Sequence, residues 1–176
     1  MIIYFVRHGQ TDLNVHHILQ GNTVDEPLND EGVKEMEVLL PTLPKDFEII
    51  YSSPHKRVLQ SAEIIKEYSG KEINIRKELE ERDFGSLDGK TWDAIPEGQE
   101  LVVKDINQQY DYRPYGGESV GDVTLRLQKF LQIAKNSEHR AALAVSSVGI
   151  VRLLYKILLN EKVVKIKNGS IHRFEI

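Results

Sequence analysis

Short apolar runs alternate along the chain with longer segments in which apolar residues recur every three or four positions. The short runs predict five strands, at 2–6, 47–51, 73–75, 141–145 and 170–176. The longer segments predict four helices, at 29–40, 54–70, 119–134 and 150–159. Strands that alternate with helices predict an α/β fold, a three-layer α/β/α sandwich with a mostly parallel central sheet.

Local signals define some of the element ends. Ser52 and Ser53 followed by Pro54 predict a serine cap with proline at the first position of the second helix. Ser119 and Asp122 have capping-box spacing at the start of the third. The stretch 79–89 predicts a loop, and 92–110 has no single period, so we expect short helices there.

Length and composition restrict the class of protein. A chain of 176 residues with 40% hydrophobic content predicts one domain over 1–176. The absence of cysteine excludes disulfide frameworks, thiolate zinc sites and cysteine nucleophiles, and it suits a reducing cytoplasm. The uncharged stretch 141–151 is far shorter than the roughly 18–20 apolar residues that cross a bilayer. The first residues lack the charged leader of a signal peptide, so we expect a cytoplasmic protein without a membrane partner.

The overall charge bears on possible partners. A net charge of −4 and a pI near 5.9 argue against binding to nucleic acid, which usually requires a basic face. An anionic ligand must therefore be bound by a few local cations. No pattern in the sequence specifies an oligomeric state.

Candidate chemistry lies directly after the predicted strands, where ligands bind in open α/β sheets. Arg7 and His8 follow the first strand, and Arg57 lies in the first turn of the helix after the second. Glu81 lies in the loop after the third strand. Two guanidinium groups, an imidazole and a carboxylic acid at strand ends predict a phosphoryl-transfer site without a cluster of metal ligands.

Several motifs occur in order over nearly the whole chain. They are V-R-H-G-Q-T at 6–11, P-L-N-D-E-G at 27–32, S-S-P-H-K-R at 52–57, L-E-E-R-D-F-G at 79–85 and G-G-E-S at 116–119. With these motifs the chain resembles the histidine phosphatase superfamily, which also contains the cofactor-dependent phosphoglycerate mutases. The resemblance implies a phosphoglycerate mutase-like fold.

The resemblance also implies the catalytic roles. His8 would be the nucleophile that forms a phosphohistidine, Glu81 the proton donor, and Arg7 and Arg57 the groups that bind the phosphoryl oxygens. An alkoxide leaves poorly unless an acid protonates it, and the same carboxylate can then deprotonate the attacking water. Because His8 must be neutral and Glu81 protonated when the ester bond breaks, we expect a bell-shaped rate profile with an acidic-to-neutral optimum.

Three further residues match positions in the pocket of the family. Asn14 would direct its amide toward the phosphate, and Gln20 and Gly21 would contact the substrate. The resemblance implies no cofactor and no metal ion. It implies a small phosphorylated metabolite, or phosphate itself, as the ligand.

The last family motif, V-S-H-G at the end of the fourth strand, is altered. The chain reads Val145-Ser146-Ser147-Val148, so that Ser147 stands where the resemblance places a second histidine and Val148 where it places glycine. A serine hydroxyl can bind a phosphoryl oxygen, but it has no positive charge, and charge-assisted hydrogen bonds are roughly twice as strong as neutral ones.

Two functions therefore remain open. The first is a metal-independent phosphomonoester hydrolase, with activity reduced by Ser147. The second is a non-catalytic protein of the same fold that binds a phosphate ligand or acts as a scaffold. A mutase is less favoured, because the resemblance implies that mutases carry a longer insertion between the Glu81 region and G-G-E-S, where this chain has only Lys90 to Tyr115. Four aromatic residues in this segment could pack on an organic leaving group, although aromatic residues in such a segment more often only pack within the protein: Trp92, Tyr110, Tyr112 and Tyr115.

Overall fold

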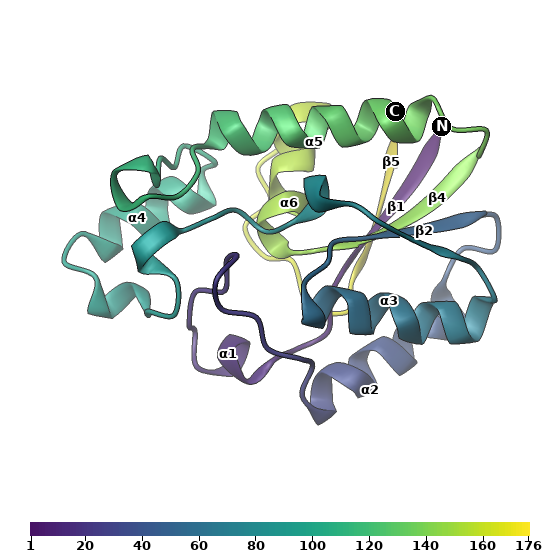
Figure 1. The fold of residues 1–176 in the computed structure, drawn as a ribbon, viewed down its shortest axis with the longest axis horizontal. Helices are drawn as coiled ribbons and strands as arrows, with labels where there is room; N and C mark the ends of the chain where they lie inside the picture. The colour runs from purple at the N-terminus through teal and green to yellow at the C-terminus, as the bar shows by residue number, and fades with distance from the viewer.

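A five-stranded sheet forms the middle of the molecule in the computed structural model, which describes residues 1–176 (Figure 1). The strands lie in the order β3-β2-β4-β1-β5. Their bounds are β1 (Ile2–Arg7), β2 (Ile49–Ser52), β3 (Ile73–Ile75), β4 (Ala141–Ser146) and β5 (Ile171–Glu175). Strands β1 to β4 run parallel to one another, and β5 runs antiparallel to β1. The predicted mostly parallel sheet is thus confirmed.

Helices cover both faces of the sheet. On one side lie α2 (Asp30–Leu39) and α3 (Lys56–Ser69), and on the other α5 (Val120–Lys135) and α6 (Val148–Leu154) (Figure 1). The central strands supply alternate residues to two separate cores. Ala142 and Ala144 of β4 pack with α5 and α6, whereas Leu143 and Val145 pack with α2 and α3. This alternation explains the continuous apolar run of β4 and confirms the three-layer sandwich.

The predicted start of α3 is wrong in detail. Pro54 precedes the helix, whose N-cap is His55, with φ −61°, ψ 138° and no capping hydrogen bond from its own side chain. The Ser52 hydroxyl donates instead to the carbonyl of Ser53. The carboxylate of Asp25 accepts hydrogen bonds from the Lys56 N–H at 2.8 and 3.0 Å. A residue distant in sequence therefore takes the place of the local serine cap.

Other boundaries differ by smaller amounts. The capping box of Ser119 and Asp122 is present as predicted, and Gly70 ends α3 with φ 69°. The strand predicted from position 47 begins at Ile49, and the predicted helix 150–159 starts at Val148 and becomes a π-helical turn over Tyr155–Leu159. The short helix α1 (Asp12–Val15) was not predicted.

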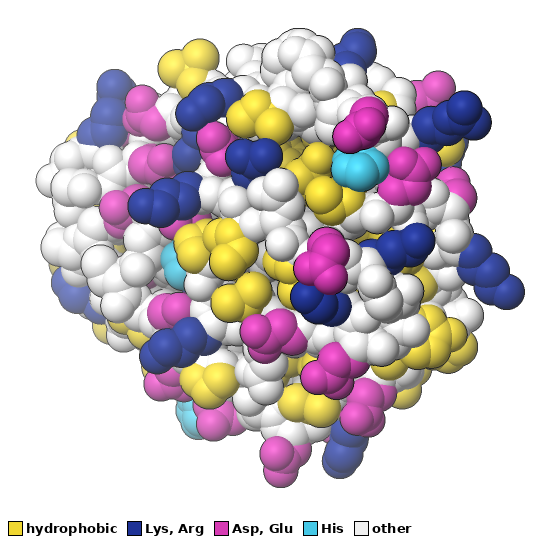
Figure 2. All heavy atoms as spheres, turned by 45° about the vertical axis from the view of Figure 1, so that its right-hand side comes forward, with side chains coloured by type: hydrophobic (Ala, Val, Ile, Leu, Met, Phe, Trp, Pro, Cys, Tyr) yellow, Lys and Arg dark blue, Asp and Glu magenta, His cyan; other side chains and the backbone are white.

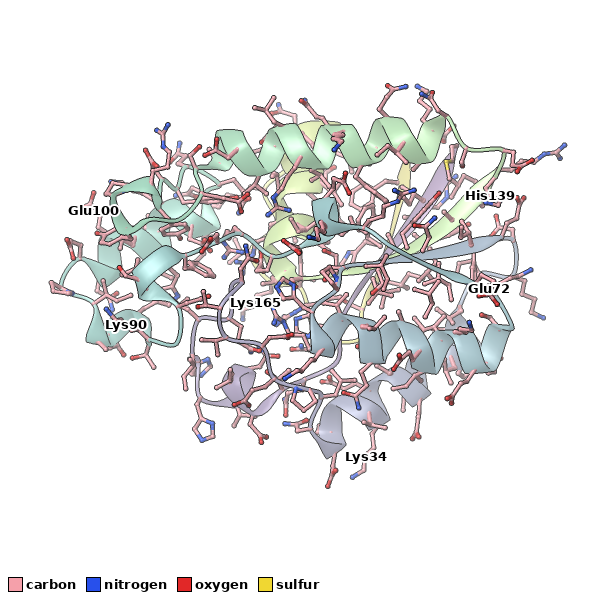
Figure 3. All side chains as sticks on the ribbon, in the orientation of Figure 1. Lys34, Glu72, Lys90, Glu100, His139 and Lys165 are labelled. Atoms are coloured by element: carbon pink, nitrogen blue, oxygen red, sulfur yellow. The ribbon has the colours of Figure 1, made fainter.

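The segment between β3 and α5 consists of short helices and turns, as expected for 92–110. It contains α4 (Gly98–Ile106) and four 3₁₀ turns, at 77–79, 85–87, 92–94 and 113–115. The segment lies with α1 on the side toward which the parallel strands point (Figure 1). Lys90 and Glu100 mark this end of the molecule, and Glu72 and His139 mark the opposite end (Figure 3).

Charged side chains of both signs are intermingled with hydrophobic ones on the face shown in Figure 2. None of the helices has the length and apolar character required to cross a bilayer. The two chain ends meet at the rim of the sheet, where the N-terminal ammonium group donates to the Ile176 carbonyl at 2.8 Å.

Candidate active site

A cavity of about 650 Å³ lies beyond the carboxyl ends of the parallel strands. Arg7 and His8 reach it from the end of β1, and Arg57 reaches it from the first turn of α3. Glu81 and Arg82 enter from the segment after β3. The parallel sheet therefore brings together four residues that sequence reasoning selected from three different places in the chain.

His8 is held as a neutral imidazole. The ring is buried, and its Nδ1 lies 2.7 Å from the carbonyl oxygen of Gly9. A carbonyl oxygen only accepts, so the ring proton is on Nδ1 and the lone pair is on Nε2. Burial, followed by the positive charges of Arg57 and Arg7, holds the pKa of His8 well below its usual value. The geometry thus provides an unprotonated nitrogen beside two guanidinium groups.

Arg57 is buried and fixed by the loop that follows α1. Its Nη2 donates to the carbonyls of Gln20 at 3.1 Å and Gly21 at 3.4 Å, and its Nη1 lies 3.2 Å from Asp25 Oδ1. Burial lowers the pKa of Arg7 to about 10, which still leaves it charged at neutral pH. The Nε atoms of both arginines are buried and make no hydrogen bond within the protein. Such unpartnered donors fit an anionic ligand.

Three further residues were predicted to contact phosphate or substrate, and only two of them line the cavity. Asn14 and Gln20 line the cavity. The Asn14 Oδ1 accepts from Thr11 N and from Asn168 Nδ2, and the Gln20 amide nitrogen donates to Thr11 Oγ1 at 2.7 Å. Gly21 is not part of the cavity wall, and its carbonyl helps to hold Arg57.

Glu81 is buried and accepts three hydrogen bonds. Its Oε1 accepts from the backbone N–H and from Nη1 of Arg82, at 2.9 and 2.7 Å, and its Oε2 accepts from the Gly149 N–H at 3.1 Å. Burial by itself raises the pKa of Glu81, but the charge of Arg82, the two backbone N–H groups and Arg57 outweigh it. The pKa of Glu81 therefore lies below its usual value, and the side chain is a carboxylate at neutral pH.

Ser147 and Val148 lie at the start of α6. Ser147 is buried, and its hydroxyl makes no hydrogen bond within the protein. Val148 lines the cavity at this point, and Ser147 does not. Of these two altered residues, Val148 therefore lies at the cavity, and the Ser147 hydroxyl lies next to it in the chain without a hydrogen-bond partner.

Seven of the 22 residues that line the cavity are hydrophobic and contribute apolar wall. Its hydrophobic lining consists of Ile18, Leu19, Phe84, Trp92, Val102, Ile106 and Val148. Of the four aromatic residues considered from sequence, Trp92 reaches this wall. Tyr110 and Tyr112 are fully buried in the core, and Tyr115 is bonded to Glu97 outside the cavity.

Sequence reasoning missed several residues of the cavity, notably Arg82, Asp105, Arg152 and Asn168. Arg82 stands in the charged run 80–83, a pattern that usually indicates a solvated loop. Asp105 lies in the stretch that had no clear period. Their one available signal was the position of Arg82 directly after Glu81. No group of three His, Asp or Glu side chains is arranged to hold a metal ion.

Comparison with known proteins gives consistent matches over the chain. The family model "Histidine phosphatase superfamily (branch 1)" matches residues 3–176. Phosphoglycerate mutase-like protein 4 of Arabidopsis thaliana is 31% identical over 99% of this chain and 79% of its own length. Fructose-2,6-bisphosphatase TIGAR of Xenopus tropicalis is 31% identical over 72% of this chain and 47% of its own length. The crystal structure of phosphoglycerate mutase from Thermus thermophilus is similar with a TM-score of 0.79 at 28% identity, covering 98% of this chain and 92% of that one.

Proposed function

The chain belongs to the histidine phosphatase superfamily, and from the cavity we propose that it is a metal-independent phosphomonoester hydrolase that acts through a phosphohistidine at His8. One observation carries this proposal. The unprotonated Nε2 of a neutral His8 lies among two arginines with unpartnered buried N–H groups, with the carboxyl group of Glu81 in the same cavity. These are the parts that transfer of a phosphoryl group to nitrogen requires.

The reaction has two steps. In the first, His8 Nε2 attacks phosphorus, the bond from phosphorus to the ester oxygen breaks, and Glu81 gives its proton to the departing alkoxide. In the second, water attacks the phosphohistidine, Glu81 takes a proton from the water, and phosphate leaves with His8 neutral again. Arg7 and Arg57 meet the charge on the transferring group, and Asn14 contributes an amide N–H.

The low pKa of Glu81 gives this mechanism a definite pH dependence. Only the protonated form of Glu81 can serve as the acid in the first step, and its population falls as the pH rises through its pKa. The low pKa of His8 keeps the imidazole neutral down to acidic pH. We therefore expect kcat/KM for an alkyl phosphate to be greatest on the acidic side of neutrality, whereas a flat profile would contradict the assigned roles.

The proposed substrate is a small phosphorylated metabolite. The cavity provides one strongly cationic end for a phosphoryl group, and an apolar wall with Trp92 and Gln20 nearby for the alcohol. Hydrolysis is favoured over a mutase reaction because the segment 90–115 is short, which leaves water access to the phosphohistidine. Neither a nucleic acid nor a membrane is among the proposed partners.

Ser147 supports a reduced rate. Its buried hydroxyl has no protein partner, it is not part of the cavity wall, and it lacks the charge of the histidine that the family resemblance places there. Loss of one transition-state donor typically costs ~10²–10³ in turnover. The same observation favours the second candidate, a non-catalytic phosphate-binding protein, whereas the buried and fully bonded Glu81 favours the enzyme because simple binding has no use for it.

The deciding experiment measures hydrolysis of 4-nitrophenyl phosphate and a panel of small alkyl phosphates in the presence of EDTA, for the protein and for His8→Ala. We expect activity that the variant lacks, and an acid-labile phosphoprotein after a quench at alkaline pH. Binding of inorganic phosphate, measured by calorimetry, separates the two candidates. Phosphate binding without turnover would support the non-catalytic protein and contradict the enzyme.

A further inference from the structure

Beside Glu81, a chain of buried polar side chains continues along the cavity through Arg82 and Asp105. Arg82 Nη1 donates to Glu81 Oε1 at 2.7 Å, while its Nε and Nη2 donate to the two carboxylate oxygens of Asp105 at 2.6 and 2.7 Å. The Tyr112 hydroxyl in turn donates to Asp105 Oδ1 at 2.8 Å. Glu81, Arg82 and Asp105 are all at most 4% exposed. One guanidinium group is therefore shared between two buried carboxylates.

Aromatic rings and a close backbone approach hold this chain in place. The Arg82 guanidinium carbon lies 4.7 Å from the centre of the Phe84 ring and 5.5 Å from that of Tyr110. On the other side, a Cβ atom at Gly149 would collide with Arg82 Nη1 and Glu81 Oε1. Only glycine allows α6 to approach the pair this closely, and its N–H binds Glu81.

We propose that Arg82 and Asp105 are a positioning pair for Glu81, in which Arg82 fixes the Glu81 carboxyl group and Asp105 limits how strongly Arg82 holds it as a carboxylate. The inference rests on the proposed role of Glu81 as proton donor. Without Asp105, the full charge of Arg82 would act on Glu81, and the proton needed by the leaving group would bind less readily. Because Asp105 lies on α4, the segment between β3 and α5 helps to determine how readily Glu81 binds its proton.

Other charged and titratable groups also face Glu81. They are Arg7 from β1, His55 and Arg57 at the start of α3, Tyr110 from the segment after α4, and Arg152 from α6. All of them are unchanged in the variants below, so a difference between variants reports the positioning pair. Among these groups, Arg152 also lies 3.6 Å from Asp105.

The first test reads the titration of Glu81 directly. In protein labelled with [¹³C]glutamate, the carboxyl signal of Glu81 is identified by its loss in Glu81→Gln and followed with pH. We expect Arg82→Gln to raise the pKa of Glu81 by about 1 unit or more, since a paired arginine commonly lowers the pKa of a carboxyl by 1–3 units. Asp105→Asn, which is nearly isosteric, should move it in the opposite direction.

A double variant guards against loss of the fold. Arg82→Gln alone removes the two hydrogen bonds of Arg82 to the buried Asp105, which keeps Tyr112 and, at 3.6 Å, Arg152, whereas Arg82→Gln/Asp105→Asn leaves neither charge of the pair. The pKa of Glu81 should then rank, from low to high, Asp105→Asn, unchanged protein, double variant and Arg82→Gln. The matched control is Asp111→Asn. Asp111 makes the same two contacts with Arg113, at 2.8 and 2.7 Å, in an exposed position, and its loss should leave the titration of Glu81 unchanged.

The second test uses the leaving group. 4-Nitrophenolate leaves without a proton, and an alkoxide does not, so a fault in positioning the acid should affect alkyl phosphates more. We expect Arg82→Gln to lower kcat/KM for an alkyl phosphate at least about tenfold more than for 4-nitrophenyl phosphate. The alkaline limb of the alkyl phosphate profile should move up in pH for Arg82→Gln and down for Asp105→Asn.

The outcomes separate this inference from the proposed function. Equal losses for both substrates, with an unmoved titration of Glu81, would overturn the positioning pair while leaving the phosphatase intact. If the unchanged protein hydrolyses neither substrate but the Glu81 signal shifts in the expected order, the pair stands as the control of Glu81 protonation, and the proposed function falls.

Discussion

The two sides of the cavity are built in different ways. Arg7, His8 and Arg57 are supplied by the ends of regular elements, β1 and α3, which are fixed by the apolar core. The opposite side, with Glu81, Arg82 and Trp92, comes from the segment between β3 and α5, which has few regular elements and is held by buried hydrogen bonds and aromatic packing.

This difference in construction parallels a difference in chemistry. In the proposed mechanism, Arg7 and Arg57 on the strand-end side meet the phosphoryl group, which is common to all phosphomonoesters. In the same proposal, the other side supplies the proton and a surface for the alcohol, which differs between substrates. We therefore expect variants on the strand-end side to affect all substrates alike, and variants on the other side to discriminate between leaving groups.

Glu81→Gln should have the largest effect and the clearest discrimination. Removing the acid should lower kcat/KM for alkyl phosphates by ~10²–10⁴, the usual contribution of general acid catalysis. For 4-nitrophenyl phosphate the first step needs no proton, so the loss in kcat/KM should be less than about tenfold. Steady-state kinetics with both substrates test this expectation, and equal losses would remove the proposed division between the two sides.

Arg57→Gln should show the opposite behaviour. Loss of one charged donor to the phosphoryl group should lower kcat/KM by ~10²–10³ for both substrates. The matched control is Arg113→Gln, which removes an exposed arginine outside the cavity and should leave the rates unchanged. A loss confined to alkyl phosphates would indicate that Arg57 acts on the leaving group, and it would contradict the proposed division between the two sides of the cavity.

The start of α6 lies between the two sides, since Ser147 directly follows β4 and Gly149 binds Glu81. If Ser147 and Val148 limit phosphoryl transfer, Ser147→His with Val148→Gly should raise kcat at least about tenfold for both substrates. Single-turnover measurements of phosphohistidine formation would locate the gain in the first step. An unchanged rate of formation would remove these two residues as the cause of a slow reaction.

The strand-end side was predictable from sequence because its signals are local. A buried β-branched run followed by Arg7 and His8, and a helix start that contains Arg57, place these residues at one sheet edge once a parallel sheet is assumed. Glu81 was found through the spacing of a motif. The alternation of strands with helices predicted the fold, including the three layers, and the order of motifs implied the same fold by resemblance.

The other side was not predictable because its contacts join residues far apart in sequence. Asp105 is paired with Arg82 across 23 positions, and nothing near Asp105 distinguishes it from an exposed helical aspartate. For Tyr110 and Tyr112 the sequence left open both contact with a leaving group and packing within the protein, and both residues are buried in the core. In each case tertiary packing, rather than local pattern, decides between a surface, a core and a cavity position.

Trp92→Ala should have the smallest effect, and it tests whether the apolar wall contacts the alcohol at all. Trp92 packs edge-on against Phe84, with ring centres 6.1 Å apart, and lines the cavity. An aromatic contact of this kind contributes about 0.5–1.5 kcal/mol, which corresponds to a change of roughly 2–12-fold. We expect KM to rise by this factor for 4-nitrophenyl phosphate, with kcat nearly unchanged. KM for methyl or ethyl phosphate should be unaffected, because we expect such small alcohols not to reach the indole.

Trp92→Phe, which retains an aromatic face, should recover most of the affinity for the aryl ester. A loss in kcat for both esters would instead show that Trp92 supports the placement of Glu81 and Arg82. The apolar wall and the proton donor would then not act independently.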